Sequence, residues 1–367
     1  MKYYIIAGEA SGDLFGARII QEIKSIDPNS EIRFWGGDKM ISSGGTLVKH
    51  IKDLAFMGFF EVFINIRSIF NNLNFCKKDI ASFNPDRIIY IDYPGFNLRI
   101  SSWAKKKGFK NFYYISPQIW AWKESRIKII KKSIDKLFVI FPFEKEYYIK
   151  KHNMETEYYG HPLIENFNSF KPNSNFLSDN NIPTDKPIIS LLPGSRKQEI
   201  KSMLPVFITL ANNFDKYTFV IAGVKNIEVE YYNQFLIDGI YLVTNSTYDL
   251  LSHSFASIVT SGTASLECSL FNLPQVVCYK TSLFSFFIGK IFVKLKYISL
   301  VNIILNKEVV KELIQNNLNN KNILEEFLSI TNAETRNRIK QDYSKIYNIL
   351  KGDNTSFKIA SSIVSYL

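Results

Sequence analysis

Residues 3–25 read YYIIAGEASGDLFGARIIQEIKS, and this stretch contains the pattern that decides the fold. The short apolar run from Tyr3 to Ala7 predicts a strand that is buried on both faces of a sheet. Glycines and polar residues follow, and the segment from Asp13 to Ser25 predicts a helix. A strand, a loop and a helix in this order form the repeating unit of a parallel α/β sheet.

The same order recurs in both halves of the chain. Further strands are expected at residues 31–35, 87–92, 111–115, 136–141, 188–192, 218–222, 240–243, 257–260 and 275–279. Further helices are expected at residues 58–75, 98–107, 125–133, 143–151, 200–213, 248–252 and 263–271. This alternation predicts an α/β protein with open, mostly parallel sheets that helices cover on both faces.

Two domains are expected, because the chain of 367 residues is more than twice the usual domain length of about 150 residues. Residues 166–186 are rich in Asn, Ser, Pro and Asp, which is typical of a linker. We therefore expect Rossmann-like domains at residues 1–170 and 187–335, with parallel sheets that face a central cleft. Residues 336–367 predict C-terminal helices that can pack back on the first domain.

The composition is globular, with 46% hydrophobic and 22% charged residues, and it excludes disorder or coiled coil as the main architecture. The three cysteines and four scattered histidines form no disulfide framework and no metal-binding motif, so we expect no metal site. The N-terminal apolar run is too short for a signal peptide. No window of about 18 uncharged apolar residues predicts a spanning helix.

The net charge of +11 is concentrated in one part of the chain. Between Arg99 and Lys151 there are 14 Lys and Arg residues against 4 Asp and Glu residues, a balance of +10. Such a block favours an anionic partner, which could be a nucleic acid, a phosphorylated substrate or an acidic lipid surface. A solvated basic helix face explains the block equally well.

Ligands of parallel sheets bind at the loops that follow the carboxyl ends of the strands. The first such loop, residues 7–13, contains Gly8 and Gly12, which allow the backbone to approach a ligand closely. It also carries Glu9 and Asp13, but it lacks the GxGxxG spacing of a dinucleotide site. A glycine turn with Asp13 as a helix cap is the structural alternative.

The second loop, LLPGSRKQE at residues 191–199, has the features of a phosphate site. Gly194 and Ser195 can present backbone N–H groups, and the guanidinium of Arg196 can bind phosphate with two donors. The alternative is a proline-glycine turn with an arginine on the surface.

The third loop, TSGTASLE at residues 260–267, places small residues before an expected helix. Ser261, Gly262 and Thr263 would present the N-terminus of that helix to a diphosphate. Glu267 could bind the two hydroxyls of a ribose, although a simple helix cap explains the segment too. Two phosphate-type loops in the second half predict that a nucleotide binds there.

An apolar segment follows Met57. Its helical stripe is wider than a normal core face and includes Phe59, Phe60, Phe63, Ile66 and Phe70. We interpret it as an acyl-chain and membrane-facing patch, with an unusually apolar buried helix as the alternative.

Eleven segments together carry a family resemblance. They are AGEASGD (7–13), WGGDKM (35–40), MGFFEV (57–62), IDYPGFNLR (91–99), YISPQIWAWK (114–123), VIFPFEKEYY (139–148), GHPL (160–163), LLPGSRKQEI (191–200), SGTASLE (261–267), YISLVNI (297–303) and VVKELIQ (309–315). In these segments, in order and spacing, the chain resembles the lipid-A-disaccharide synthases.

The resemblance implies a two-domain glycosyltransferase fold of the B type and an inverting, metal-independent reaction without a cofactor. The implied donor is UDP-2,3-diacylglucosamine, and the implied acceptor is 2,3-diacylglucosamine 1-phosphate. The products would be the β-1,6-linked disaccharide 1-phosphate and UDP. The expected location is the cytoplasm, with peripheral attachment to the anionic surface of the inner membrane. No nucleic acid is expected as a partner, and a homodimer is compatible with the family.

Roles for individual residues are also expected. From the chemistry of the loops we expect Arg196, Ser261, Gly262 and Thr263 to bind the diphosphate and Glu267 to bind the ribose, with Gly194 and Ser195 also in the UDP site. The resemblance supplies one more residue. Asn302 would lie in the active-site cleft, with a helix cap as its alternative role.

The catalytic base is the one role for which the chain departs from the family. Many relatives have an aspartate, a candidate base, where this chain has Gly95. Asp92 is the nearest substitute, and Glu9 and Asp13 are the other candidates.

Two other functions compete with this interpretation. One is a different UDP-sugar enzyme of the same fold, such as a glycolipid N-acetylglucosaminyltransferase or an epimerase. A soluble epimerase would not need the wide apolar stripe. The other is a basic RNA-binding protein, but the basic block contains no RNP motif, and the phosphate-type loops would have no explanation.

Overall fold

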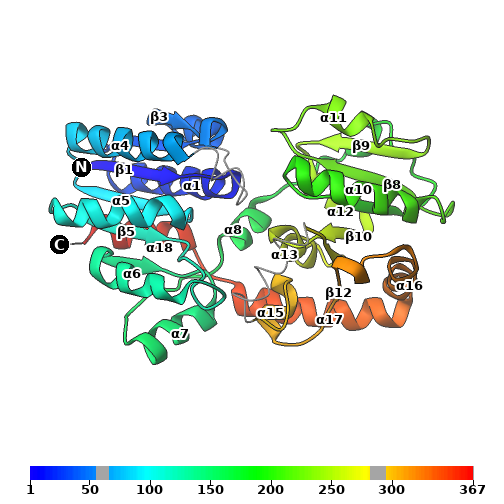
Figure 1. The fold of residues 1–367 in the computed structure, drawn as a ribbon. Coiled ribbons are helices and arrows are strands. Elements are labelled where there is room, and N and C mark those ends of the chain that lie inside the picture. The colour runs from blue at the N-terminus through cyan, green and yellow to red at the C-terminus, as the bar shows by residue number, and fades with distance from the viewer. Residues whose placement is uncertain (55–65, 282–294, 367) are drawn as a thin grey trace. The chain divides into compact units, whose positions relative to one another are not determined.

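The computed structural model describes residues 1–54, 66–281 and 295–366. The chain forms two compact units (Figure 1). The first comprises residues 1–165 and 350–367, and the second comprises residues 166–349. Residues 336–349 thus belong to the second unit, whereas the last helix belongs to the first.

The first unit contains a six-stranded parallel sheet in the order β3-β2-β1-β4-β5-β6. Its strands are β1 (Lys2–Ala7), β2 (Glu31–Gly36), β3 (Thr46–His50), β4 (Arg87–Ile91), β5 (Lys110–Tyr114) and β6 (Lys136–Phe138). The order is that of a Rossmann fold, in which the chain leaves β1 toward one edge and later leaves β4 toward the other.

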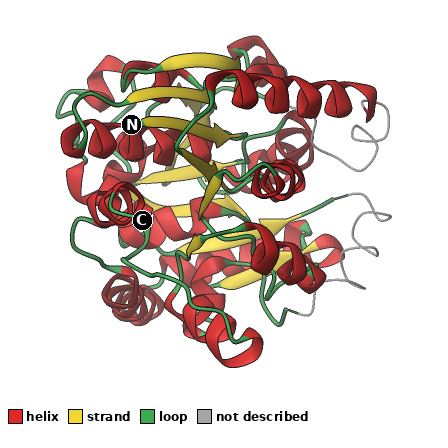
Figure 2. Cartoon of the chain, turned by 90° about the vertical axis from the view of Figure 1, so that its left-hand side faces the viewer, coloured by secondary structure: helices red, strands yellow, loops and turns green. Residues whose placement is uncertain are grey.

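Helices cover both faces of this sheet, as Figure 2 shows in red around the yellow strands. They are α1 (Ala10–Ile26), α2 (Asp38–Ser42), α4 (Ile66–Phe83), α5 (Pro94–Lys106), α6 (Ile127–Ser133), α7 (Pro142–His152) and α18 (Thr355–Val364), with 3-10 turns η1 (Ile51–Leu54) and η2 (Glu124–Arg126). Helix α1 packs against α2 and α18, and α5 packs between α4 and α6. Right-handed crossover connections place helices on both faces of the sheet. The reason is that the chain moves toward one sheet edge after β1 and toward the other edge after β4.

The second unit repeats the architecture, with the order β12-β11-β10-β7-β8-β9. Its strands are β7 (Ile188–Leu192), β8 (Thr218–Gly223), β9 (Ile240–Thr244), β10 (Ser254–Thr260), β11 (Gln275–Tyr279) and β12 (Lys311–Ile314). Its helices are α9 (Phe176–Asp179), α10 (Lys197–Ala211), α11 (Val229–Asn233), α12 (Thr247–His253), α13 (Thr263–Leu270), α15 (Leu300–Leu305), α16 (Asn320–Thr331) and α17 (Ala333–Leu350), with the 3-10 turn η3 (Gln315–Asn317). Helix α8 (Pro162–Ser169) spans the boundary between the units.

The central strands are the ones that the apolar runs predict. All residues from Tyr3 to Ala7 and from Ile88 to Ile91 have no exposed surface, as expected for strands covered on both faces. Strands β3 and β12 were not predicted. Both lie at a sheet edge and are only partly buried, so their sequences contain no apolar run.

Helix α4 differs from the helix expected at residues 58–75. It continues to Phe83, because Leu73, Cys76 and Ile80 lie on one buried face at helical spacing. Residues 58–65 of the expected helix lie outside the described residues. The structure describes no helix with the length and apolar character that a membrane span requires.

Candidate active site

The first part of the site lies where strand order reverses in the sheet of the first unit. Strands β1 and β4 are neighbours, and Ala7 is paired in register with Ile91. The chain leaves these strands in opposite directions, and ligands of such sheets bind at the loops that follow this reversal. Glu9 follows β1, and Asp92 and Tyr93 follow β4, so the structure brings two candidate bases to the same sheet edge.

Asp92 and Tyr93 are held in an unusual backbone conformation. Both have a left-handed φ, at 47° and 49°, which costs free energy for residues other than glycine. The Asp92 carbonyl accepts hydrogen bonds from the Tyr113 hydroxyl at 2.6 Å and from the Asn97 amide at 2.7 Å. The Asp92 N–H donates to the Tyr114 carbonyl at 3.1 Å. These bonds fix the backbone of the turn at Asp92.

The surroundings of Asp92 change its acidity. Burial, together with the negative charge of Glu9, raises its pKa to about 7, against the smaller lowering effects of the Tyr93 N–H group and the Arg126 charge. A carboxyl group with this pKa is ionised in a large fraction at neutral pH and still takes up a proton readily. Asp92 thus has the acidity of a general base.

Gly8 is required by the same turn. A Cβ atom on Gly8 would lie 2.4 Å from Cγ of Tyr93, closer than any real contact. The Tyr93 ring also stacks on Phe96, with ring centroids 5.4 Å apart. The glycine of the first loop therefore serves the packing of Tyr93, which fixes the two loops against each other.

Of the two roles considered for Asp13, the structure shows that of a helix cap, although for α2 and not for its own helix. Asp13 is buried, and its carboxylate accepts hydrogen bonds from the backbone N–H groups of Gly37 (2.7 Å), Lys39 (3.1 Å) and Met40 (3.1 Å). It thereby caps α2, while Glu9 is the N-cap residue of its own helix α1. We assign Asp13 to the support of this loop and not to proton transfer.

Glu144 was not identified from the sequence. Its side chain is fully buried at the start of α7 and accepts hydrogen bonds from the indole N–H of Trp120 (2.9 Å) and the backbone N–H groups of Ile140 (3.0 Å) and Phe141 (3.1 Å). Burial raises its pKa to about 7 despite these bonds. Its place three residues into a helix that begins with Pro142 is a capping-box signal that could have revealed it.

The second part of the site lies at the corresponding reversal in the second unit. Strands β7 and β10 are neighbours there, and Leu192 is paired in register with Val259. The loops at 193–196 and 261–262 therefore leave the same edge of the sheet. The two phosphate-type loops that the sequence predicts separately are thus neighbours in the fold.

Glu199 organises the first of these loops. Its carboxylate accepts a hydrogen bond from the Ser195 N–H at 2.9 Å and lies 3.5 Å from the Arg196 guanidinium. Gly194 has a left-handed φ of 105°, and a Cβ atom there would lie 2.4 Å from the Glu199 carboxylate. The Ser195 N–H is therefore already paired within the protein, whereas 51% of the Arg196 side chain surface is exposed.

The N-terminus of α13 forms the other loop. Gly262 and Thr263 are exposed, and a Cβ atom on Gly262 would meet no atom within 4 Å. Ser261 is fixed, because its hydroxyl donates to the Ile298 carbonyl at 3.1 Å. Glu267 is half-buried one turn into the helix. The helix end has the open space and the positive dipole that an anion needs.

Asn302 is buried, and its amide is fully used within the protein. It donates to the Val310 carbonyl (2.8 Å) and the Glu312 carboxylate (2.9 Å) and accepts from the N–H groups of Val309 (2.8 Å) and Val310 (3.0 Å). The cap of α15 is Ser299. We therefore assign Asn302 to the positioning of the segment whose Ile298 carbonyl holds Ser261.

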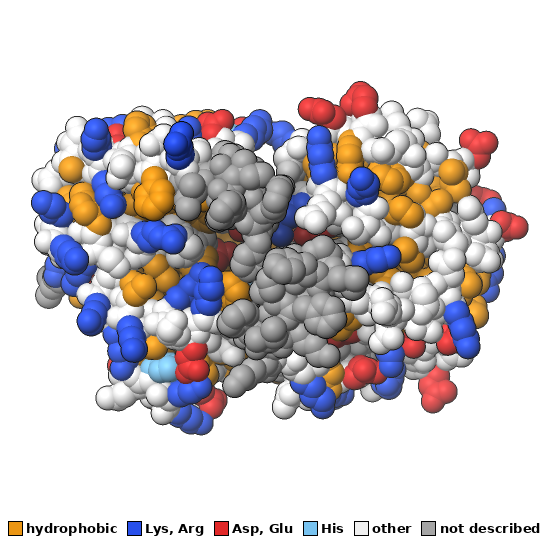
Figure 3. All heavy atoms as spheres, in the orientation of Figure 1, with side chains coloured by type: hydrophobic (Ala, Val, Ile, Leu, Met, Phe, Trp, Pro, Cys, Tyr) orange, Lys and Arg blue, Asp and Glu red, His pale blue; other side chains and the backbone are white. Residues whose placement is uncertain are grey.

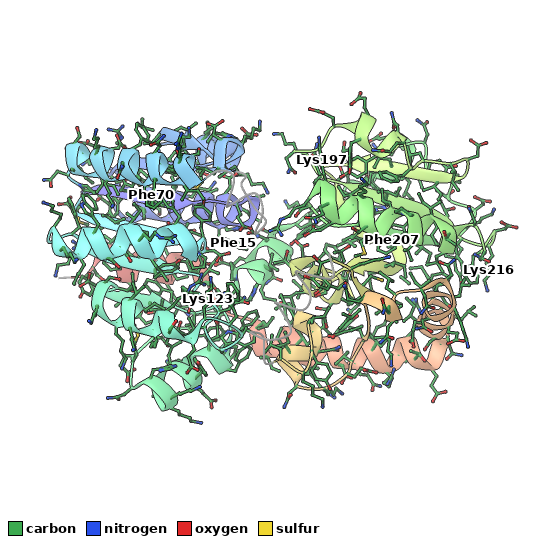
Figure 4. All side chains as sticks on the ribbon, in the orientation of Figure 1. Phe15, Phe70, Lys123, Lys197, Phe207 and Lys216 are labelled. Carbon is green, nitrogen blue, oxygen red and sulfur yellow. The ribbon has the colours of Figure 1, made fainter. Side chains whose placement is uncertain are left out.

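The apolar patch is described only at one end. Phe59, Phe60 and Phe63 lie outside the described residues, and Ile66 begins α4 without a described side chain. Phe70 is 60% exposed on α4 (Figure 4). Figure 3 shows Lys and Arg side chains in blue around orange hydrophobic groups on the face that carries α4, α5 and α6.

No three His, Cys, Asp or Glu side chains of the described residues gather into a set that could hold a metal ion.

Comparison with known sequences decides the family. The model of the lipid-A-disaccharide synthetase family matches residues 3–365. The chain belongs to this family. The lipid-A-disaccharide synthase of Coxiella burnetii (strain Dugway 5J108-111) is 35% identical over 332 residues, which cover 89% of this chain and 88% of that protein. The enzyme of Francisella philomiragia is 35% identical over 382 residues and covers 99% of both chains. Lipid-A-disaccharide synthase 1 of Legionella pneumophila (strain Paris) is 37% identical over 325 residues, 86% of this chain and 84% of that protein.

Solved structures show that this synthase family member has the two-domain glycosyltransferase fold of the B type. A UDP-GlcNAc 2-epimerase from Neisseria meningitidis, bound to UDP-GlcNAc, aligns with a TM-score of 0.69 at 14% identity, over 100% of both chains. The calicheamicin glycosyltransferase CalG4 aligns with a TM-score of 0.60 at 12% identity, over 100% of this chain and 98% of that one. The resemblance inferred from the motifs is confirmed, and the enzyme class is that of a glycosyltransferase.

Proposed function

We propose that the protein transfers 2,3-diacylglucosamine from UDP-2,3-diacylglucosamine to 2,3-diacylglucosamine 1-phosphate, forming the β-1,6-linked disaccharide 1-phosphate and UDP. The proposal is carried by the functional groups that lie where strand order reverses in the two sheets of this family member. A carboxyl group with a raised pKa lies at one reversal, and anion-type loops lie at the other. A glycosyl transfer from a nucleotide needs both kinds of group.

The second unit binds the donor in this proposal. Arg196 and the N-terminus of α13, at Ser261, Gly262 and Thr263, bind the diphosphate, and Glu267 binds the ribose hydroxyls. Gly194 and Ser195 shape the loop that presents Arg196, because Glu199 already accepts the Ser195 N–H. As UDP departs with the bonding electron pair, the guanidinium and the helix dipole stabilise its negative charge without a metal ion.

The first unit supplies the base. The oxygen of the acceptor 6-hydroxyl bonds to the anomeric carbon from the face opposite UDP, which inverts that carbon. The proton of the hydroxyl passes to the Asp92 carboxylate, whose pKa burial and the Glu9 charge raise toward neutrality. The relatives' aspartate at the position of Gly95 would lie only three residues away on the same turn.

The lipid substrates require access to a membrane surface. We propose that the protein attaches peripherally to the cytoplasmic face of the inner membrane. Exposed Phe70 and the basic residues around α5 and α6 support this proposal, since an apolar group surrounded by cations suits an anionic leaflet.

A mass-spectrometric assay of the purified protein with both acylated substrates tests the reaction. We expect the disaccharide 1-phosphate and UDP in equal amounts, in EDTA as well as in magnesium, and a β linkage by NMR. Activity that EDTA abolishes and magnesium restores would show that the metal-independent mechanism is wrong. Conversion of the UDP-sugar without an acceptor would instead identify an epimerase.

A further inference from the structure

Three cations form a cluster beside Asp92 in the first unit. Lys123 Nζ lies 4.1 Å from the centre of the Trp122 ring, and the Arg126 guanidinium lies 5.7 Å from the same centre. Arg99, in the first turns of α5, donates a hydrogen bond to the Gly95 carbonyl on the turn that follows Asp92. We call Arg99, Lys123 and Arg126 the cation cluster. Figure 4 labels Lys123 in the loop between β5 and η2.

The charges of the cluster act on one another. Burial, and after it the charges of Arg126 and Arg99, lower the pKa of Lys123. Arg126 is half-buried, and its charge also reaches the carboxyl of Asp92. Arg99 and Lys123 are exposed. Like charges that the fold holds close together repel one another, and a bound anion would relieve this repulsion.

No carboxylate of the described residues forms an ion pair with any member of the cluster. Glu124, which follows Lys123 directly, pairs with Lys151 at 2.7 Å and with His152 at 3.2 Å. The cations of the basic block that do form ion pairs with described carboxylates are Lys105, Lys136, Lys150 and Lys151. What distinguishes the cluster from the other unpaired cations of the block is that its charges act on one another and that Arg126 also acts on Asp92.

The backbone holds the cluster in place. Lys123 has a left-handed φ of 51° and immediately precedes η2, which ends at Arg126. Arg99 is tied to the start of α5 by its bond to Gly95, and α5 packs on α6. Two guanidinium groups and one ammonium group supply donors of the kind that bind the oxygens of a phosphate group.

We propose that the cation cluster binds a phosphate monoester, the 1-phosphate of the acceptor sugar. The assignment of this phosphate to the acceptor rests on the proposed function. The neutral donor sugar has no such group, and the UDP phosphates have their own loops in the second unit. Binding of the 1-phosphate here places the acceptor beside Asp92, whose carboxylate takes the proton from the attacking hydroxyl.

The test uses glucosamine 1-phosphate, which carries the phosphate without acyl chains. Its binding to the full-length protein is measured by phosphorus NMR for the wild type, Arg126→Gln and Lys123→Gln. We expect each variant to weaken binding roughly 10-fold or more, because a charge-assisted contact is lost. Lys132→Gln is the matched control, since Lys132 is an exposed cation of the same basic block outside the cluster.

Measurements of kinetics and of membrane binding distinguish the acceptor 1-phosphate from a lipid headgroup as the ligand of the cation cluster. In detergent micelles without anionic lipid, the cluster variants should raise KM for the acceptor and leave KM for the UDP-sugar unchanged. Sedimentation with phosphatidylglycerol vesicles should be equal for the cluster variants and Lys132→Gln. Loss of vesicle binding with unchanged glucosamine 1-phosphate binding would overturn the proposal and assign the cluster to lipid headgroups. Unchanged binding of both probes would overturn it as well.

The assay for disaccharide formation and the binding test for the cluster can fail separately. If the wild type binds glucosamine 1-phosphate through the cluster but forms no disaccharide, the phosphate site stands and the proposed function fails. If the wild type forms the disaccharide but the variants bind the probe normally, the cluster proposal fails alone.

Discussion

Glu9 and Asp92 lie at the ends of the neighbouring strands β1 and β4, and burial together with the Glu9 charge raises the pKa of Asp92 to about 7. Because the Glu9 charge acts on Asp92, the two carboxyl groups cannot both ionise without a cost in free energy. One of them therefore keeps its proton to a higher pH. In the proposed mechanism Asp92 accepts the proton of the substrate, and Glu9 acts through its charge.

We expect the single-turnover rate with saturating substrates to rise with pH and to level off above about pH 7, because Asp92 must be ionised to accept a proton. The single-turnover rate of Asp92→Asn should be about 100- to 10,000-fold lower than that of the wild type. Glu9→Gln should keep most of the rate and shift the rise to lower pH, since loss of the Glu9 charge lowers the pKa of Asp92. If Asp92→Asn remains active while Glu9→Gln does not, Glu9 is the base.

The same pKa predicts a pH-dependent stability. The pKa of Asp92 rises from 3.8, its ordinary value, to about 7 on folding, so the folded protein loses stability as the pH rises between these two values. An asparagine at this position has no such ionisation. The melting temperature of Asp92→Asn relative to the wild type should therefore be higher at pH 8 than at pH 5. An equal difference at both pH values would show that the Asp92 pKa is not raised.

Gly95→Asp restores the aspartate of the relatives and should fold normally. A Cβ atom at Gly95 would meet no atom within 4 Å, and an acidic residue in the first turn of α5 interacts well with the helix dipole. We expect an unchanged melting temperature. A single-turnover rate above that of the wild type would show that the absent aspartate limits the reaction. An unchanged rate would support Asp92 as a sufficient base.

Arg196→Ala should reduce turnover by roughly 100-fold or more, because a contact to the leaving group acts mainly in the transition state. Lys201→Ala is the control, since Lys201 is an exposed cation on helix α10, which begins directly after Arg196. The measurement is steady-state release of UDP by both variants. Wild-type kinetics in a folded Arg196→Ala protein would exclude Arg196 from the site.

Asn302→Ala should destabilise the fold by on the order of 3 kcal/mol in urea denaturation, because it leaves several buried hydrogen-bonding groups without partners. Activity should decline only as far as the variant disturbs the segment whose Ile298 carbonyl accepts the hydrogen bond of Ser261. A variant with full stability but no activity would favour a direct catalytic role for Asn302 over the positioning role.

Phe70→Ser should weaken sedimentation with anionic vesicles and leave the melting temperature unchanged, because the Phe70 side chain is 60% exposed. Leu328→Ser is a matched control in the second unit, where Leu328 is 50% exposed. A stability loss in Phe70→Ser would place the ring in the core. The triple variant Phe59→Ser, Phe63→Ser, Phe70→Ser extends the test across the expected patch.

Local patterns in the sequence were sufficient to predict the central strands and the loops that follow them. The runs at Tyr3–Ala7 and Ile188–Leu192 must be apolar in any sheet that is covered on both faces, so they can be recognised without knowledge of their neighbours. The edge strands β3 and β12 escape prediction, because a half-exposed strand has no comparable constraint.

The roles of individual polar residues were decided by the tertiary structure. Asp13 and Asn302 are candidates for chemistry in the sequence, but their polar groups are occupied by backbone atoms of distant or adjoining segments. Glu144 and the cation cluster were not singled out, although Glu144, Arg99 and Lys123 lie in segments that carry the family resemblance. Arg126 lies outside those segments.

The sequence by itself thus determined two parallel α/β units, the loops with ligand-binding chemistry and the family. Only the tertiary structure decided which loops are neighbours, which carboxyl group has a raised pKa and which cations lack a carboxylate partner within the described residues. The physical reason is that desolvation and charge interactions depend on distances of a few ångströms between groups such as Glu9 and Asp92, which are 83 residues apart in the chain.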